Sequence, residues 1–260
     1  MPSRAPYPAK WLCERIVASR LELTSQVSMA THGPAHETRP RIFSDYDIHY
    51  VLRGVVEYIY ADRTLRVPEA HFILLPPGKR FVQREPRGRN RGVALYFAHF
   101  RQAEDGPDPL KALELPFKVR AANPADAENL LRRLAQSTST QREADPWALL
   151  RAKAGLLDLL TLLLETALRQ KRLCFDPTRA GPAWLWRVLE EMDRGLGQAG
   201  MDISSLARSA HLSPSQFAHQ FRRYLGAAPM KLLMRKRLQR ACALLTSDEL
   251  LPIKEIAAAC

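Results

Sequence analysis

The chain has 260 residues, enough for more than one hydrophobic core, and its hydrophobic (46%) and charged (25%) fractions exclude a disordered or membrane-embedded chain. Its net charge of +12 and pI near 9.9 favour a polyanionic partner, of which nucleic acid is the commonest. The alternatives are that the positive charge only aids solubility or that it contacts anionic lipid.

Cysteine spacing and apolar runs indicate the compartment. The four cysteines are widely spaced and form no CxxC pair, which is typical of reduced thiols and argues against a disulfide scaffold or a zinc ribbon. Residues 1–10 contain no apolar signal segment, and the most apolar run, 156–164, is too short to span a bilayer. We therefore expect a cytoplasmic protein that does not enter the membrane.

The region from Trp11 to Phe117 is predicted to be rich in β-strands. Its runs of β-branched, aromatic or alternating residues lie at 48–52, 55–60, 64–67, 72–75 and 92–100. The first two flank Arg53-Gly54 and predict a hairpin, and Pro76-Pro77-Gly78 ends the fourth. Short strands separated by turns predict a small antiparallel barrel or sandwich, which we place in a domain of residues 1–120.

A helical segment follows at 121–182. Ala127, Leu130, Leu131 and Leu134 predict one helix, which the polar run 136–140 ends. Pro146 is predicted to open a second helix that reaches Leu168. Its apolar stripe is Trp147, Leu150, Ala154, Leu157, Thr161 and Leu164, widened by Leu156, Leu159, Leu160 and Leu163. This wide face predicts either packing on the chain's own barrel or a homodimer through helix 146–168. Residues 175–182, with two prolines and a glycine, are predicted to be a linker.

Residues 202–226, in a predicted domain of residues 183–260, have the pattern of a helix-turn-helix. Asp202 can cap a short first helix, and His211 can adopt the positive φ of a tight turn. Ser213, followed by Pro214 and by Gln216 three residues on, predicts a capping box, and Gly226 suits the end of the second helix.

The second helix of this motif has two different faces. Phe217 and Phe221, four residues apart, predict its buried stripe. Its outer face is polar and basic: Ser215, Ala218, His219, Arg222 and Arg223. In a helix-turn-helix the second helix enters the major groove with its N-terminal residues at the base edges.

Positive charge accumulates without acidic neighbours after this turn. Between residues 208 and 240 the chain has eight Lys or Arg and no Asp or Glu: Arg208, Arg222, Arg223, Lys231, Arg235, Lys236, Arg237 and Arg240. A solvated helical face usually mixes both signs, so this pattern predicts contacts with phosphates. The alternative is a basic helical hairpin used only for packing.

These residues resemble the AraC/XylS family of bacterial transcription regulators. The resemblance is carried by Leu206-Ala207, Leu212-Ser213-Pro214-Ser215, Phe217, Phe221-Arg222-Arg223, Leu225-Gly226, Pro229, Arg237-Leu238, Arg240-Ala241, Leu244-Leu245, Ile253 and Glu255-Ile256-Ala257. It covers about the last sixty residues and implies two helix-turn-helix units joined by a long helix, here 229–245.

The resemblance also implies roles for single residues. Ser215, Ala218 and His219 correspond to base-contacting positions, and Ser213, Arg222 and Arg223 to positions near phosphates. Family members often have Arg where His219 stands, and Ala218 can offer only an apolar contact. With Gln216 these six residues form the predicted DNA-binding set. In the family the segment 256–260 continues into a second recognition helix, so we expect the second unit to be incomplete and DNA binding to be weaker than that of a completed version.

The N-terminal part resembles the cupin-like sensor domains of this family, through the segments 50–54, 70–78 and 96–100. In metal-dependent cupins His and carboxylate ligands stand at positions that Arg41, Phe43 and Phe81 occupy here. Arg and Phe cannot ligate a metal, so the sequence predicts no metal, no cofactor and no cupin enzyme. His49, His71 and His99 are interpreted as separate core or pocket-wall residues. Since no Gly-rich phosphate loop, HExxH or GxSxG motif is present either, no catalytic residues are expected.

A pocket for a small effector is the remaining prediction for this domain. The candidates combine aromatic faces with hydrogen-bond donors, a chemistry that suits sugars and similar polar molecules: Arg41, Tyr50, Tyr58, Tyr60, Tyr96 and His99. Each can equally be structural, and a one-residue slip in a strand would turn every side chain to the other face. The basic run 79–91 is predicted to be a solvated loop, with an anion site or a DNA contact as the alternative.

Together these observations predict an α+β protein with three parts: an N-terminal antiparallel cupin-like barrel, a helical linker and a C-terminal all-α helix-turn-helix domain. The expected function is that of a sequence-specific DNA-binding transcription regulator modulated by a small molecule in the barrel. The alternative is a cupin-type, sugar-binding protein whose DNA-binding module is vestigial.

Overall fold

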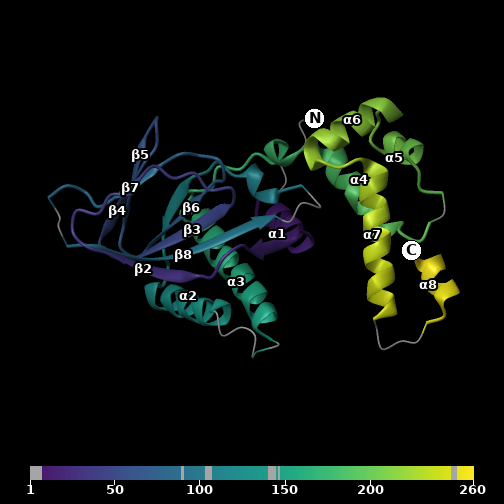
Figure 1. The fold of residues 1–260 in the computed structure, drawn as a ribbon. Coiled ribbons are helices and arrows are strands. Elements are labelled where there is room, and N and C mark those ends of the chain that lie inside the picture. The colour runs from purple at the N-terminus through teal and green to yellow at the C-terminus, as the bar shows by residue number, and fades with distance from the viewer. Residues whose placement is uncertain are drawn as a thin grey trace. The chain divides into compact units, whose positions relative to one another are not determined.

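A computed structural model describes residues 8–88, 91–102, 107–139, 145, 147–198, 200–246 and 251–260. The chain divides into two compact units (Figure 1). Unit 1 comprises Met1–Ala103 and Leu113–Phe175, and unit 2 comprises Glu104–Ala112 and Asp176–Cys260. Strands lie in unit 1 and the helix-turn-helix lies in unit 2, so the predicted α+β class is confirmed.

Two antiparallel sheets form unit 1. Within the described residues the larger has the order β1-β8-β3-β6-β9, with β2 also paired to β8: β1 (Leu21–Leu23), β2 (Ser28–His32), β3 (Tyr46–Arg53), β6 (His71–Leu75), β8 (Val93–Gln102) and β9 (Phe117–Arg120). The smaller has the order β5-β4-β7: β4 (Val55–Ile59), β5 (Thr64–Pro68) and β7 (Val82–Arg84). Val51, Val56, Ile73 and Leu95 come from both sheets and belong to one buried core, as in the predicted barrel.

The predicted hairpin at Gly54 is wrong. β3 is paired along both of its edges, with β6 and β8, so no edge remains for β4, which pairs instead with β5 and β7. Gly54 therefore carries the chain from one sheet to the other, at φ +91°. A Cβ there would lie 2.7 Å from the carbonyl oxygen of Gly92, which explains why the junction needs glycine.

A helix, α1 (Pro8–Ala18), precedes the strands in a region that was expected to be β-rich from Trp11. Its buried residues Leu12 and Ile16 are four apart, the spacing of one helical face. The helices α2 (Pro124–Thr138) and α3 (Ala148–Arg169) also belong to unit 1 and pack against each other. α3 contacts β1 and β9 of the larger sheet.

The apolar stripe that was predicted to be buried on α3 lies largely on the outward side of this helix. Leu156, Leu159 and Leu163 are buried, whereas Trp147 is 62% and Leu150 is 61% exposed. The leucine-rich face is wider than one stripe, so periodicity alone could not locate its centre. Pro146, which was predicted to open the helix, lies outside the described residues, as do Arg89 and Asn90 of the basic run.

The predicted linker 175–182 contains a short 3-10 helix, η3 (Pro177–Ala180), which Asp176 caps. Phe175 belongs to unit 1, where it forms a bridge with Leu113 and packs edge-on against Trp11 at 5.3 Å between ring centroids. Within unit 2, η3 contacts a second 3-10 helix, η1 (Pro109–Ala112). The boundary between the two units falls inside this segment, between Phe175 and Asp176.

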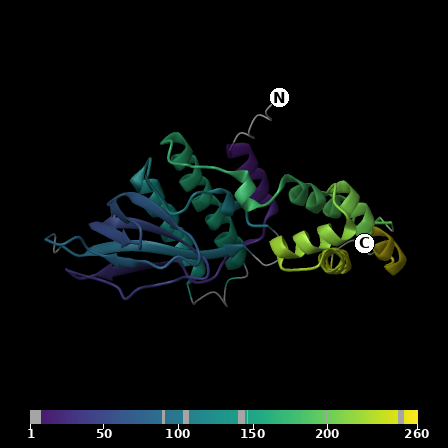
Figure 2. The ribbon, with the colours of Figure 1, turned by 90° about the horizontal axis from the view of Figure 1, so that it is seen from above.

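The helices of unit 2 are α4 (Ala183–Arg194), α5 (Ile203–Ser209), α6 (Pro214–Leu225), α7 (Pro229–Leu245) and α8 (Ile253–Ala259). The first four contribute to one apolar cluster, and α8 contacts α7. The predicted long helix at 229–245 is confirmed to the residue. Figure 2 looks nearly along α7 and shows α6 lying across its direction.

Candidate nucleic-acid interface and effector site

Hydrogen-bonded caps fix both helices of the turn motif. The Asp202 carboxylate accepts from the backbone N–H of Ser205 at 2.7 Å, and the Ser205 hydroxyl oxygen accepts from that of Asp202 at 3.1 Å. The bonds from Ser205 also lower the pKa of Asp202, because they favour the ionised carboxylate. Asp202 is thus the predicted N-cap, in a capping box with Ser205.

The turn between α5 and α6 has the backbone that the sequence predicts. His211 adopts φ 57°, and its N–H donates to the Arg208 carbonyl at 3.0 Å. The Ser213 hydroxyl oxygen accepts from the backbone N–H of Gln216 at 3.3 Å, and the Gln216 side chain accepts from that of Ser213 at 3.3 Å. Gly226 ends α6 in the left-handed region, at φ 70°.

The inner face of α6 fixes that helix on the core of unit 2. Phe217 and Phe221 are fully buried, with ring centroids 5.3 Å apart. Trp184 of α4 packs edge-on against Phe217 at 5.7 Å. Because these aromatic contacts leave little freedom of rotation, they determine which residues of α6 face outward.

The predicted DNA-binding residues lie on or beside the outer face of α6. Ser215, His219 and Arg222 are exposed and follow the spacing of one helical face, and Arg223 is exposed beside them. Ala218 is half-buried at the edge of this face. Ser213 and Gln216 are exposed but bond to each other, so their first role is to cap the helix.

Lys236 and Arg237, which belong to the eight basic residues, form contacts inside unit 2. Lys236 lies 2.6 Å from the carboxylate of Asp193. Arg237 donates to the carbonyls of Leu196 and Gln198 at 2.9 and 2.8 Å. The sequence between 208 and 240 could not indicate these contacts, because the partners of both residues lie earlier in the chain, within α4 or directly after it. Lys236 and Arg237 are therefore not expected to contact phosphates.

A polar network lies inside the barrel of unit 1. Asp47 on β3 is fully buried, and one carboxylate oxygen lies 2.5 Å from Nε2 of His49. Nδ1 of His49 lies 2.6 Å from the hydroxyl of Tyr58 on β4. Because a carboxylate only accepts hydrogen bonds, His49 donates from Nε2 to Asp47, and its Nδ1 can then accept from Tyr58. On β8, His99 Nε2 lies 3.5 Å from the same Asp47 oxygen, and its Nδ1 lies 3.1 Å from Asp45.

Several buried polar atoms of this barrel have no hydrogen-bond partner within the described part of the chain. They are the second carboxylate oxygen of Asp47, the hydroxyl of Tyr60, Nε2 of Gln83 and Nε2 of His36. A buried polar group without a partner is costly, and such groups in one interior are typical of a place that receives a polar ligand or water.

The electrostatics of this interior follow from its burial. Burial raises the pKa of Tyr58 well above its usual value, and the charge of Asp47 adds to this effect. Burial also lowers the pKa values of His32 and His36, whose rings stack at 3.7 Å, and Arg41 lowers both further. The interior thus favours the neutral form of Tyr58 beside the carboxyl group of Asp47.

Strand alternation separates the predicted effector residues. Tyr58 and His99 belong to the interior network. Tyr50 and Tyr96 are direct partners across β3 and β8 and lie on the opposite face. The Tyr50 hydroxyl donates to the carbonyl of Pro124 at 3.5 Å, and burial raises its pKa to about 12. Arg41 is exposed, and its backbone pairs with Phe81.

Sequence reasoning missed Asp45 and Asp47 and treated His49 and His99 as separate. The structure brings both histidines to Asp47, and only His71 stands apart, with Nδ1 2.9 Å from the carbonyl of Glu69. A signal was present, because Asp45, Asp47 and His49 alternate with Tyr46 and Ile48 and therefore share one face of a strand.

The positions assigned to lost cupin ligands do lie together. Arg41 and Phe81 form a bridge, and the rings of Phe43 and Phe81 are 5.6 Å apart. Among the described residues no group of three or more His, Cys, Asp or Glu has an arrangement that could hold a metal ion. No helix in the described ranges combines the length and the apolar character needed to cross a membrane.

Comparison with known proteins gives matches to two domain families. An AraC-like ligand binding domain matches residues 26–173, and a helix-turn-helix domain matches residues 206–260. No curated protein matches the chain significantly.

Solved structures resemble the chain only distantly. ToxT of Vibrio cholerae, bound to an unsaturated fatty acid, is 9% identical over 92% of this chain and 87% of its own, with a TM-score of 0.38. YhaK of Escherichia coli is 15% identical over 38% of this chain and 50% of its own, with a TM-score of 0.27. The Cnp3 cupin domain of Schizosaccharomyces pombe is 14% identical over 33% and 62%, also at 0.27.

The assignment rests on the domain families and on the geometry of the two units. The AraC-like ligand binding domain spans more than half of the chain, and the helix-turn-helix match covers α6, α7 and α8. The chain therefore belongs to the AraC family, as a DNA-binding regulator of transcription with a ligand-binding domain and a helix-turn-helix domain.

Proposed function

We propose that the chain is a sequence-specific regulator whose helix α6 enters the major groove and places Ser215 and His219 against base edges. The observation that carries this proposal is the fixed orientation of α6: Phe217 and Phe221 are fully buried, so the face with Ser215 and His219 is held outward. Each exposed group on that face can donate or accept a hydrogen bond.

Arg222 and Arg223 follow on the same helix, and in this proposal they contact phosphates. Among the described residues, neither arginine forms an ion pair with an acidic side chain of unit 2. Phosphate contacts position the helix and add salt dependence, whereas the base contacts supply the specificity.

A mobility-shift titration on fragments of the upstream promoter tests this function. Full-length protein should bind one fragment in preference to an equal length of unrelated DNA. His219→Ala should reduce that preference, while Lys171→Ala, which changes an exposed cation in unit 1, is the matched control. Failure to bind any DNA at low salt would favour the alternative, a small-molecule binding protein with a vestigial DNA-binding module.

For the effector we propose a small, uncharged polar molecule, such as a sugar, in the interior of the barrel. The support is the set of unpaired polar atoms around Asp47, Tyr60 and Gln83, which offers both acceptors and donors to hydroxyl groups. Tyr58 and His99 remain effector residues in this proposal. Tyr50 and Tyr96 do not, since they lie on the other face of the sheet.

We further propose that the chain forms a homodimer through the first turns of α3. Trp147, Leu149 and Leu150 are 62%, 67% and 61% exposed and fall within four residues of the chain at the start of α3. Large apolar side chains clustered in this way are typical of a surface that another chain covers. Two copies would each supply one reading helix, so that two half-sites strengthen a weak single contact.

A further inference from the structure

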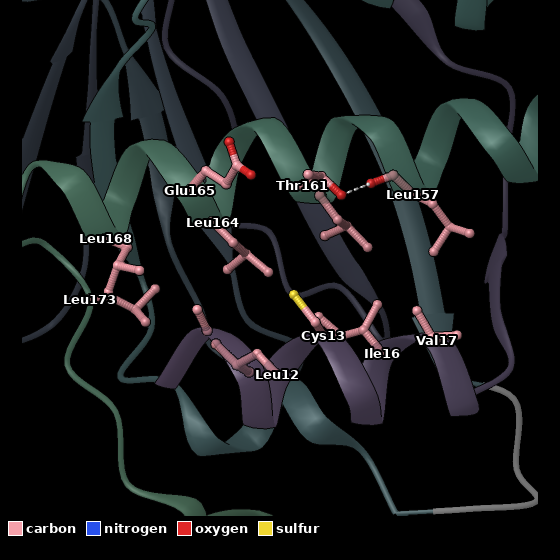
Figure 3. A pocket seen from close by; sticks show the side chains of 12 residues that line it. Leu12, Cys13, Ile16, Val17, Leu157, Thr161, Leu164, Glu165, Leu168 and Leu173 are labelled. Carbon is pink, nitrogen blue, oxygen red and sulfur yellow. Dashed lines mark hydrogen bonds between the residues drawn. The ribbon is translucent and has the colours of Figure 1, made fainter. Parts of the chain in front are cut away.

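A pocket lies outside the barrel, between α1 and α3. Its volume is about 150 Å³. Figure 3 shows Leu12, Cys13 and Ile16 of α1 pointing toward α3, which faces them with Leu157 and Leu164. Leu12 and Ile16 are buried, so the pocket has a closed floor, while the thiol side of Cys13 remains accessible.

The walls of this pocket offer almost no hydrogen-bonding chemistry. Thr161 already donates its hydroxyl to the carbonyl of Leu157 at 2.8 Å. Glu165 stands at the rim and pairs with Arg169 at 3.6 Å, both side chains being largely exposed. A site with so few polar partners does not hold ordered water well, because a buried water needs two to four of them.

Size and charge restrict what can enter. An apolar cavity of this volume accepts a molecule about the size of benzene. The residues that line it include no Lys or Arg, and the charge of Glu165 is already offset by Arg169, so an anionic head group would lose water without gaining a partner.

We propose that the pocket between α1 and α3 binds a small, uncharged apolar molecule, either a single aromatic ring or a short aliphatic chain. Bound there, the molecule joins α1 to the helix that supports the larger sheet through β1 and β9. The site is separate from the polar interior around Asp47, and its failure would leave both the DNA-binding and the barrel proposals standing.

Cys13 provides the reporter, since its sulfur lines the pocket. The full chain is prepared with Cys174, Cys242 and Cys260 replaced by Ser, which leaves Cys13 as the thiol that reacts with an aromatic disulfide reagent. Benzene and 1-hexanol should slow this reaction saturably, by about eleven-fold when the molecule is at ten times its Kd. Hexanoate, which carries a negative charge, should slow it much less.

Filling the pocket provides the decisive comparison. In Thr161→Phe the new ring occupies the space, so benzene should no longer protect Cys13. Asp158→Phe changes an exposed residue of α3 that does not line the pocket, and protection should persist. Circular dichroism establishes that each variant is folded. If Thr161→Phe does not fold, Leu164→Phe is used instead as the variant with a filled pocket.

Three results would overturn the proposal. They are no slowing by benzene or hexanol up to their solubility, equal slowing in the filled and unfilled proteins, or stronger slowing by hexanoate than by hexanol. An independent measurement is the melting temperature of the unmodified chain, which benzene should raise in the wild type and in Asp158→Phe but not in the filled variant.

Discussion

Asp47 and His49, two residues apart on β3, face the barrel interior together, with a carboxylate oxygen 2.5 Å from Nε2 of the imidazole. The opposite nitrogen of His49 is engaged by Tyr58 from the other sheet. This chain of three side chains therefore ties the two sheets together through a buried charge. A charge in that position stabilises the fold only while its partners remain in place.

Replacement of Asp47 should destabilise unit 1 strongly. In Asp47→Ala the buried His49 and the nearby His99 lose their acceptor, so we expect a loss of about 3 kcal/mol in the free energy of unfolding. Asp45→Ala is the matched control, since Asp45 is half-buried and bonds only to exposed or half-buried groups. It should cost about 1 kcal/mol. Urea unfolding followed by tyrosine fluorescence measures both, and equal losses would contradict the special role of Asp47.

Gly226 should be required for its backbone and not for its small size. A Cβ built at this position meets no atom within 4 Å, yet the residue adopts φ +70°. Gly226→Ala is therefore expected to cost about 1 kcal/mol through backbone strain alone. Gly200→Ala is the control, because space is equally open there and no positive φ is required. Thermal unfolding of unit 2 should show a lower melting temperature for the first variant alone.

Local sequence signals predicted unit 2 better than unit 1. The bounds of the turn motif follow from Asp202, His211, Ser213 and Gly226, because caps and left-handed positions act on their own neighbours in the chain. The pairing of β4 depends instead on which sheet edges are free, and no residue near Gly54 indicates which edges these are.

The candidate sites show the same division. The outer face of α6 could be predicted, since helical spacing from Phe217 and Phe221 determines it. The partners of Lys236 and Arg237 could not, because they lie about forty residues earlier and meet them only in the folded unit. In the barrel, alternation along β3 would have been enough to place Asp47 beside His49, although this was missed, whereas the approach of His99 required the register of β8.

Arginines of unit 2 should separate into DNA-contacting and structural ones. Arg222→Ala is expected to lower the affinity for all DNA sequences and to reduce the slope of log K against log salt by about one. Arg237→Ala should leave that slope unchanged, since its guanidinium already donates to the carbonyls of Leu196 and Gln198. It should instead lower stability by about 1 kcal/mol. Fluorescence anisotropy at several salt concentrations, with thermal unfolding of both variants, distinguishes the two effects.

The stacked pair His32 and His36 should make unit 1 sensitive to mild acid. Both pKa values are lowered in the folded chain, chiefly by burial and for His32 also by the charge of His36. The unfolded chain, with a histidine pKa near 6.5, therefore binds protons first as the pH falls. Stability is complete above pH 6.5 and decreases from there down to the folded pKa values. Melting temperatures measured between pH 8 and pH 5 should fall less steeply in His32→Gln. An unchanged slope would assign the pH dependence to other groups.

The exposed turn of α3 should determine the oligomeric state. If Trp147, Leu149 and Leu150 are covered by a second copy, Leu150→Glu places a charge in an apolar interface and should raise the dimer Kd at least about ten-fold, a change of about 1.4 kcal/mol. Met234→Glu is the matched control, because Met234 on α7 has the same exposure, 62%, as Trp147 but lies in unit 2. Sedimentation velocity over a concentration series measures both.

A wild-type chain that stays monomeric at every concentration, or a dimer that Leu150→Glu leaves intact, would show that this surface is not the interface. Loss of the dimer in Leu150→Glu should also weaken binding to a fragment with two half-sites far more than to one with a single half-site, because only the former depends on two linked reading helices.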